Sequence, residues 1–163
     1  MRESFQTRLV KQDMVFSAAH FITFNGNICE RLHGHNYRVA VDVDGPLDEN
    51  QYVIDFIALR DTLAELVHEL DHHMLLPTEH PLIKVRPGER EVEVSFEDRR
   101  WVFPREDCRL LPITNTTAEL LAAYLGRRLI ERLQAKLNWR PGRLAIEVDE
   151  NQGQWGRCTF TAD

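Results

Sequence analysis

Hydrophobic and polar residues alternate along two early segments of the chain. The first segment covers residues 7–20, where Val10, Met14 and Phe16 alternate with charged or small residues. The second covers residues 35–43, with Tyr37 and three valines on one side. A period of two is typical of strands. The second segment ends at the turn signal Asp44-Gly45-Pro46.

A loop signal, Asn25-Gly26-Asn27, lies between these two predicted strands. The strands are therefore predicted to form a long antiparallel hairpin. The loop end of such a hairpin brings His20 close to His33.

Two later segments have helical spacing. Asp55 is a candidate N-cap, and the apolar residues after it recur at steps of three and four as far as Leu70. A second helix is predicted to begin at Thr116, because Thr116-x-x-Glu119 is a capping box. Its apolar positions continue to Leu137, and Pro141-Gly142 follows.

Alternation returns in residues 144–149 and 155–161, which predict a closing hairpin. Residues 84–110 contain a further alternation, Val92, Val94 and Phe96, that predicts an extra β-hairpin. Hairpins separated by single helices favour an α+β fold. We predict one domain over residues 1–163, with an insertion at about residues 84–110.

Composition and charge argue against several classes of function. A chain of 163 residues with 43% hydrophobic content is typical of one domain. The net charge of −6 and the lack of a dense basic cluster argue against a nucleic-acid partner. The sequence has neither an apolar run of about 20 residues, as a membrane span requires, nor an apolar signal segment after Met1, so no membrane association and a cytoplasmic location are expected. Three widely spaced cysteines favour at least one free thiol.

Three histidines form a candidate metal site. His33 and His35 are two residues apart on a predicted strand, so both imidazoles project from one face. His20 on the partner strand adds a third neutral nitrogen. Three such ligands with an open fourth position are the arrangement of catalytic Zn²⁺. The alternative is that His33-Gly34-His35 is a chance surface pattern.

Other chemical groups lie near this cluster in the sequence, each with two interpretations. Cys29 is either a ligand or base beside the metal, where a cation lowers the pKa of a thiol, or a small buried side chain. Asp71 and His72 form either a proton-transfer pair or the polar end of a helix. Glu150 either accepts the paired N–H donors of a flat heterocycle or meets solvent.

Five motifs together resemble the 6-pyruvoyl- and 6-carboxytetrahydropterin synthase family. They are FSAAH (16–20), CERLHGHNY (29–37), LDHH (70–73), NTTAE (115–119) and IEVDE (146–150). The resemblance implies a tunnelling fold, in which a sheet of two hairpins backed by two helices trimerises into a barrel and two trimers form a hexamer. Active sites then lie between subunits.

The resemblance also assigns roles. It implies that His20, His33 and His35 bind Zn²⁺ and that Cys29 is the thiolate base. Asp71 and His72 become its relay partners, Glu150 the pterin anchor, and Thr116 and Thr117 part of the pocket lining.

The substrate implied by the family is 7,8-dihydroneopterin triphosphate. One branch forms 6-carboxytetrahydropterin for deazapurine (queuosine) synthesis, and another forms 6-pyruvoyl-tetrahydropterin. A third, folate-like branch forms 6-hydroxymethyl-dihydropterin and uses a glutamate three residues before His-Gly-His, the position of Glu30. This chain contains both Cys29 and Glu30, although Glu30 could equally be a solvated loop carboxylate.

The leading hypothesis is a zinc-dependent carbon–oxygen lyase with the 6-carboxy product. The rival hypothesis is a non-catalytic pterin- or purine-binding oligomer, which would require neither a thiol nor three metal-type histidines.

Overall fold

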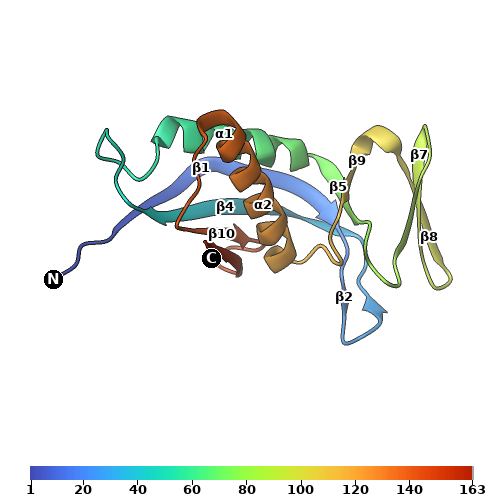
Figure 1. Ribbon diagram of the computed structural model, residues 1–163. Helices are drawn as coiled ribbons and strands as arrows, with labels where there is room; N and C mark the ends of the chain where they lie inside the picture. The colour runs from blue at the N-terminus through green and yellow to red at the C-terminus, as the bar shows by residue number, and fades with distance from the viewer. Residues whose placement is uncertain (163) are drawn as a thin grey trace.

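The largest unit of the computed structural model, which describes residues 1–162, is a six-stranded sheet (Figure 1). Its strand order is β11-β10-β4-β1-β5-β9. The strands are β1 (Phe5–His20), β4 (His33–Gly45), β5 (His73–Pro77), β9 (Cys108–Leu111), β10 (Arg143–Asp149) and β11 (Trp155–Thr161). With two helices, the chain has the α+β fold expected from its sequence.

The long hairpin of β1 and β4 places the histidines in register. His20 pairs with His33, and Ala18 pairs with His35. Residues opposite each other in an antiparallel pair project from the same face, so all three imidazoles share one face. The connecting segment forms the short strands β2 (Thr23–Phe24) and β3 (Ile28–Cys29).

The alternation in β1 changes phase at a bulge, which differs from the unbroken alternation expected. Val10 pairs with Ala40 and Val15 with Arg38, so β1 carries additional residues between them. Leu9 is buried before the bulge, whereas Phe16 is buried after it. A bulge with an odd number of extra residues moves the buried set from odd to even positions.

The two helices are α1 (Phe56–Leu70) and α2 (Ala118–Leu137). Asp55 caps α1 as predicted, and its side chain accepts from the N–H groups of Ile57 and Ala58. The predicted cap at Thr116 is wrong. The N-cap of α2 is Thr117, which accepts from Leu120 N–H. Thr116 is fully buried and donates its hydroxyl to the Phe21 carbonyl instead.

Both helices cover one face of the sheet (Figure 1). Helix α1 packs on β1, and α2 packs on β10 and β11. Between them lies the main hydrophobic cluster. Fully burying one large aliphatic side chain stabilises a fold by about 1.5–3 kcal/mol. The largest buried side chains of this cluster include Tyr37, Phe16, Met14, Leu59, Leu63, Leu66, Leu70, Leu75 and Leu111.

Residues 84–104 form a three-stranded antiparallel sheet. Its strands are β6 (Lys84–Pro87), β7 (Glu91–Phe96) and β8 (Arg99–Pro104). A one-turn 3₁₀ helix (Arg105–Asp107) joins β8 to β9. A second hydrophobic cluster attaches this sheet to the rest of the fold. It contains Phe21, Met74, Leu76, Ile83, Val92, Val94, Phe96 and Cys108.

Two strands of the main sheet were not predicted from the sequence. β5 runs parallel to β1, and β9 runs parallel to β5. Four of the five residues of β5 are buried. A strand buried on both faces lacks the alternation by which strands are recognised.

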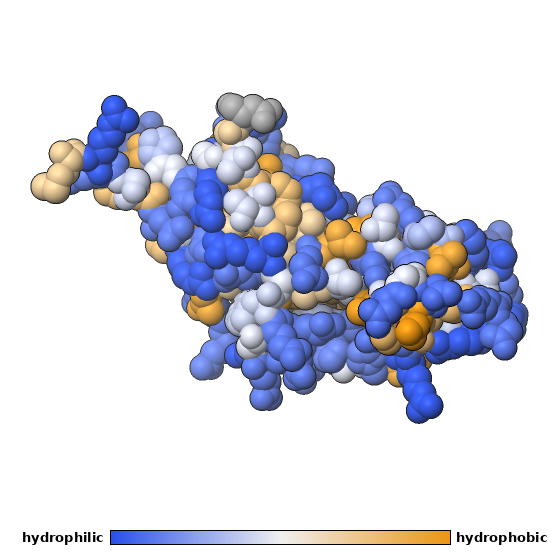
Figure 2. Space-filling view, turned by 90° about the horizontal axis from the view of Figure 1, so that it is seen from below, coloured by the Kyte–Doolittle hydropathy of each residue, from blue (hydrophilic) through white to orange (hydrophobic). Residues whose placement is uncertain are grey.

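The surface seen from below is largely hydrophilic, with separate apolar patches (Figure 2). Phe24 and Ile28 on the β2–β3 hairpin are among the exposed large apolar side chains. Within residues 1–162, no helix combines the length and apolar character that a membrane span requires.

Candidate metal centre

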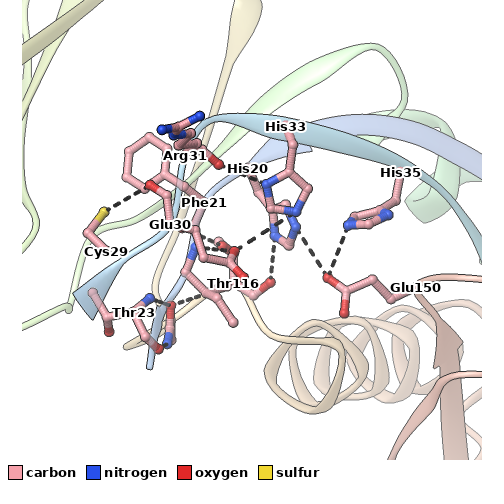
Figure 3. A network of polar contacts seen from close by, with 12 residues as sticks. His20, Phe21, Thr23, Cys29, Glu30, Arg31, His33, His35, Thr116 and Glu150 are labelled. Carbon is pink, nitrogen blue, oxygen red and sulfur yellow. Dashed lines mark hydrogen bonds and ion pairs between the residues drawn. The ribbon is translucent and has the colours of Figure 1, made fainter. Parts of the chain in front are cut away.

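Three imidazoles converge where β1 ends and β4 begins (Figure 3). Each of His20, His33 and His35 can offer one ring nitrogen, and these nitrogens lie within 4.8 Å of one another. The His20 side chain is fully buried, while 38% of the His33 side chain and 22% of the His35 side chain are exposed. One side of the cluster is therefore closed by protein and the other is accessible.

Backbone carbonyls determine which nitrogen carries the proton in two of these rings. His20 Nδ1 lies 3.0 Å from the Thr116 carbonyl oxygen, and His33 Nδ1 lies 2.8 Å from that of Arg31. A carbonyl oxygen can only accept, so Nδ1 must be the donor. In a neutral ring the lone pair is then on Nε2, which faces the other imidazoles. Metal-binding histidines are oriented by such second hydrogen bonds.

The buried Nε2 of His20 has no hydrogen-bond partner among the described residues. It lies 3.2 Å from Glu150 Oε1, which is also 3.6 Å from His35 Nε2. A lone pair that faces a carboxylate oxygen is unfavourable unless a proton or cation lies between them. The donor set therefore fits a divalent cation, and three imidazoles are a ligand set typical of Zn²⁺.

Glu150 immediately follows β10, and its backbone N–H donates to the Gln154 carbonyl oxygen. A proton on His20 Nε2, with further contributions from His35 and His33, would hold the pKa of this carboxyl below its ordinary value despite partial burial. The resemblance to the synthase family predicts Glu150 as a pterin anchor. In this structure the carboxylate lies directly against two of the metal-type histidines.

Glu30 is the second carboxylate at the cluster. Its Oε2 lies 3.9 Å from His33 Nε2 and accepts a hydrogen bond from Ile22 N–H at 3.3 Å. The backbone N–H of Glu30 donates to the Ile22 carbonyl oxygen at 2.9 Å. These contacts hold the carboxylate toward the imidazoles, as Figure 3 shows.

Cys29 lies on the far side of Glu30 from the three imidazoles (Figure 3). Its thiol donates to the Glu30 carbonyl oxygen at 3.6 Å, and the residue packs against the second hydrophobic cluster. Burial raises the pKa of the Cys29 thiol, and the positive charge of Arg99 opposes that increase. The structure thus brings Glu30 to the cluster and keeps the sulfur of Cys29 apart from it.

Asp71 and His72 follow α1, where Asp71 is the C-cap. Asp71 Oδ1 accepts from Ser17 N–H at 2.7 Å, and its other oxygen lies 2.9 Å from His72 Nδ1. The Ser17 hydrogen bond, with a smaller contribution from His72, holds the pKa of Asp71 below its ordinary value. The His72 side chain is 81% exposed. It lines an open groove of about 540 Å³ that also includes Gly34 and His35.

The remaining residues predicted for the site are Thr116 and Thr117. Thr116 supports His20 through its backbone carbonyl, and Thr117 caps α2. Two contributors were missed from the sequence, namely the Arg31 carbonyl and Arg99, whose guanidinium bonds to the Cys29 and Glu30 carbonyls. A backbone contact leaves no signal in residue type, and Arg99 lies about 70 residues from its partners.

Comparison with known proteins gives consistent matches. The family model described as 6-pyruvoyl tetrahydropterin synthase matches residues 9–160. A protein of Methanocaldococcus jannaschii, provisionally named 6-carboxy-5,6,7,8-tetrahydropterin synthase, is 33% identical over 148 residues, which cover 88% of this chain and 87% of its own length.

Solved structures from Plasmodium are also similar. The 6-pyruvoyl tetrahydropterin synthase of Plasmodium falciparum matches with a TM-score of 0.90 and 30% identity, over 99% of this chain and 100% of its own. A Plasmodium vivax 6-pyruvoyltetrahydropterin synthase matches with a TM-score of 0.89 and 27% identity, over 99% of this chain and 100% of its own. That structure is of a variant in which a glutamate described as a catalytic residue is replaced by alanine.

Proposed function

This chain belongs to the 6-pyruvoyl tetrahydropterin synthase family, and on that premise we propose that it is a zinc-dependent carbon–oxygen lyase acting on 7,8-dihydroneopterin triphosphate. The proposed product is 6-carboxy-5,6,7,8-tetrahydropterin, for deazapurine (queuosine) synthesis, or else 6-pyruvoyl-tetrahydropterin. The observation that carries the proposal is the convergence of three imidazole nitrogens within 4.8 Å, with two rings oriented by backbone carbonyls.

His20, His33 and His35 would hold the metal. Bound Zn²⁺ would supply a Lewis acid for the side-chain oxygens of the substrate. In this proposal Cys29 transfers protons at the substrate's side-chain carbons. Asp71 orients His72 as a proton carrier through the 2.9 Å contact between them.

Binding of the pterin ring is assigned to Glu150. A carboxylate has two acceptor oxygens, which suit the paired N–H donors of a pterin. Thr116 and Thr117 are proposed to support the adjacent wall. Occupation by substrate would require Glu150 to turn from its contacts with His20 and His35.

A second candidate reaction is favoured by the position of Glu30. Its carboxylate, rather than the Cys29 thiol, approaches the imidazoles, with 3.9 Å between Glu30 Oε2 and His33 Nε2. The Plasmodium vivax relative has a glutamate described as catalytic. We therefore keep as an alternative that Glu30 is the base and that the product is 6-hydroxymethyl-dihydropterin.

Product identification tests these assignments. Zinc-loaded protein is incubated with 7,8-dihydroneopterin triphosphate, and pterins and acetaldehyde are quantified. The 6-carboxy product with acetaldehyde supports the leading proposal, and 6-hydroxymethyl-dihydropterin supports the alternative. If the zinc-loaded protein binds pterin but forms none of the three products, the non-catalytic binding oligomer is the better description.

Variants of the two candidate bases separate their roles. We expect Cys29→Ala to lower formation of the 6-carboxy or 6-pyruvoyl product by about 100-fold or more, because general acid–base catalysis typically contributes 10²–10⁴-fold. Glu30→Gln is expected to lower only the 6-hydroxymethyl product. Both variants should retain zinc. Unchanged turnover in Cys29→Ala would remove Cys29 from the mechanism.

The proposed assembly is the tunnelling-fold hexamer, a dimer of trimers with active sites at subunit interfaces, in the cytoplasm. The open groove beside His35 and the exposed His72 support a site that a neighbouring subunit completes.

A further inference from the structure

Arg99, the first residue of β8, reaches from the three-stranded sheet to the loop that carries both candidate bases. Its Nη1 donates to the Cys29 carbonyl oxygen at 2.8 Å, and its Nη2 donates to the Glu30 carbonyl oxygen at 2.9 Å. The planar guanidinium fork suits two acceptors side by side, which a lysine ammonium does not reproduce.

These two carbonyls belong to consecutive residues. Successive carbonyls of an extended strand point in opposite directions, so one guanidinium can reach both only where the backbone bends. The bend coincides with the end of β3 at Cys29. The bend determines the directions in which the Cys29 and Glu30 side chains point. Glu30 lies toward His33, and Cys29 lies on the other side (Figure 3).

The guanidinium is itself held in place. It lies over the Trp101 ring, 4.6 Å from the ring centroid. Trp101 in turn stacks on Phe21, with 4.6 Å between ring centroids and 22° between planes. Phe21 directly follows His20 and is buried. A stacked, planar cation loses little further freedom when it binds two carbonyls. The loop is thus tied to the strand end that presents the buried imidazole.

We propose that Arg99 is a positioning residue that determines which of the two candidate bases, Cys29 or Glu30, faces the three imidazoles. This inference rests on the proposed function only for its effect on products. The contact between Arg99 and the loop is testable without turnover. It also assigns a role to the three-stranded sheet, because β8 supplies the cation and β7 pairs with β8.

The primary test is the alkylation rate of individual thiols in Arg99→Lys, followed by peptide mass spectrometry with iodoacetamide. Lysine keeps the positive charge beside the thiol, so a change in rate reports geometry rather than charge. The matched control is Arg100→Lys, since Arg100 is exposed and contacts Glu93 instead. We expect Cys29 to react at least about fivefold faster in Arg99→Lys, because one of two charge-assisted hydrogen bonds is lost. The control should stay within about twofold of wild type.

Cys108 provides an internal reference, because it is buried in the hydrophobic cluster against which Cys29 packs, and its thiol donates to the Pro104 carbonyl oxygen. A selective increase at Cys29 supports positioning. A parallel increase at Cys108 would mean that the three-stranded sheet has opened, and a purely structural role for Arg99 would replace the proposal. Equal Cys29 rates in the Arg99 and Arg100 variants would also overturn it.

Kinetics give the second readout. In Arg99→Lys we expect kcat for the 6-hydroxymethyl product to fall about tenfold while KM changes less than about twofold, because a misplaced Glu30 affects the transition state rather than binding. The ratio of 6-hydroxymethyl product to the other products should fall as well. Zinc content should stay at the wild-type value. If wild type forms no product, the proposed function fails, while the alkylation rates still decide the role of Arg99.

Discussion

His33 is the most exposed of the three metal-type histidines, with 38% of its side chain accessible. Its removal should therefore disturb packing less than removal of buried His20. We expect wild-type protein, purified without chelator, to contain about one zinc per chain and His33→Ala to contain almost none, because two imidazoles bind zinc far more weakly than three. Elemental analysis of both proteins gives the measurement.

A control for this measurement is His68→Ala, since His68 is exposed in the last turn of α1. This variant should retain its zinc. A bound metal also stabilises the folded state, so added zinc should raise the thermal midpoint of wild type and of His68→Ala but not of His33→Ala. Wild-type protein without stoichiometric metal would contradict the proposed centre.

Asp149 is a buried carboxylate next to Glu150. Burial alone would raise its pKa. Hydrogen bonds from Gly153 N–H and Gln154 N–H, together with the ion pair to Arg38, outweigh burial and hold the pKa of Asp149 below its ordinary value. Its stabilising effect should be fully present above the unfolded-state pKa of about 4 and be lost as pH falls through the lower folded-state pKa.

We therefore expect Asp149→Asn to be less stable than wild type at pH 6–7, and the difference in unfolding free energy to shrink below about pH 4. Urea denaturation of both proteins at several pH values provides the comparison. A difference that grows as the solution becomes more acidic would show that the sign is wrong.

At the scale of elements, β11 approaches the first turn of α2 very closely. A Cβ on Gly156 would lie 2.5 Å from the backbone carbon of Ala118 and 2.5 Å from the Glu119 nitrogen. Backbone atoms cannot rotate away as a side chain can. We expect Gly156→Ala to lower the free energy of unfolding by about 2 kcal/mol or more, since overpacking typically costs 1–3 kcal/mol.

The comparison variant is Gly126→Ala, also at the contact between α2 and β11. A Cβ there would meet the Phe160 ring at 2.3 Å. That ring is only partly buried and can move. Chemical denaturation should therefore show a smaller loss for Gly126→Ala than for Gly156→Ala, and the reverse order would refute this account of the contact.

At the scale of the whole molecule, the main sheet ends in β11 on one side and β9 on the other. Open edges present unpaired backbone groups that favour pairing with another chain. If six chains of 19.1 kDa assemble as proposed, light scattering should give a mass of about 115 kDa. A mass near that of one chain, at the concentrations used for activity, would exclude sites shared between subunits.

Patterns within short segments of the sequence were sufficient to predict several elements. The spacing of apolar residues and Asp55 identified α1 with its N-cap, and alternation identified β10 and β11. The hairpin brings His20 to His33 and His35 because strand pairing follows directly from the connecting turn. These features depend on interactions between residues near in sequence or across one hairpin.

The features that depend on residues distant in sequence were determined only by the tertiary structure. β5 and β9 form strands only because other strands and clusters bury them, and Thr116 is buried beneath His20 rather than capping α2. Which of Cys29 and Glu30 faces the imidazoles is also determined by the tertiary structure. Both residues are present in one loop, and a guanidinium about 70 residues away bends the backbone that orients them. Residue type determined which chemistry is present, whereas packing determined which group faces the imidazoles, because side-chain direction follows from backbone contacts made across the fold.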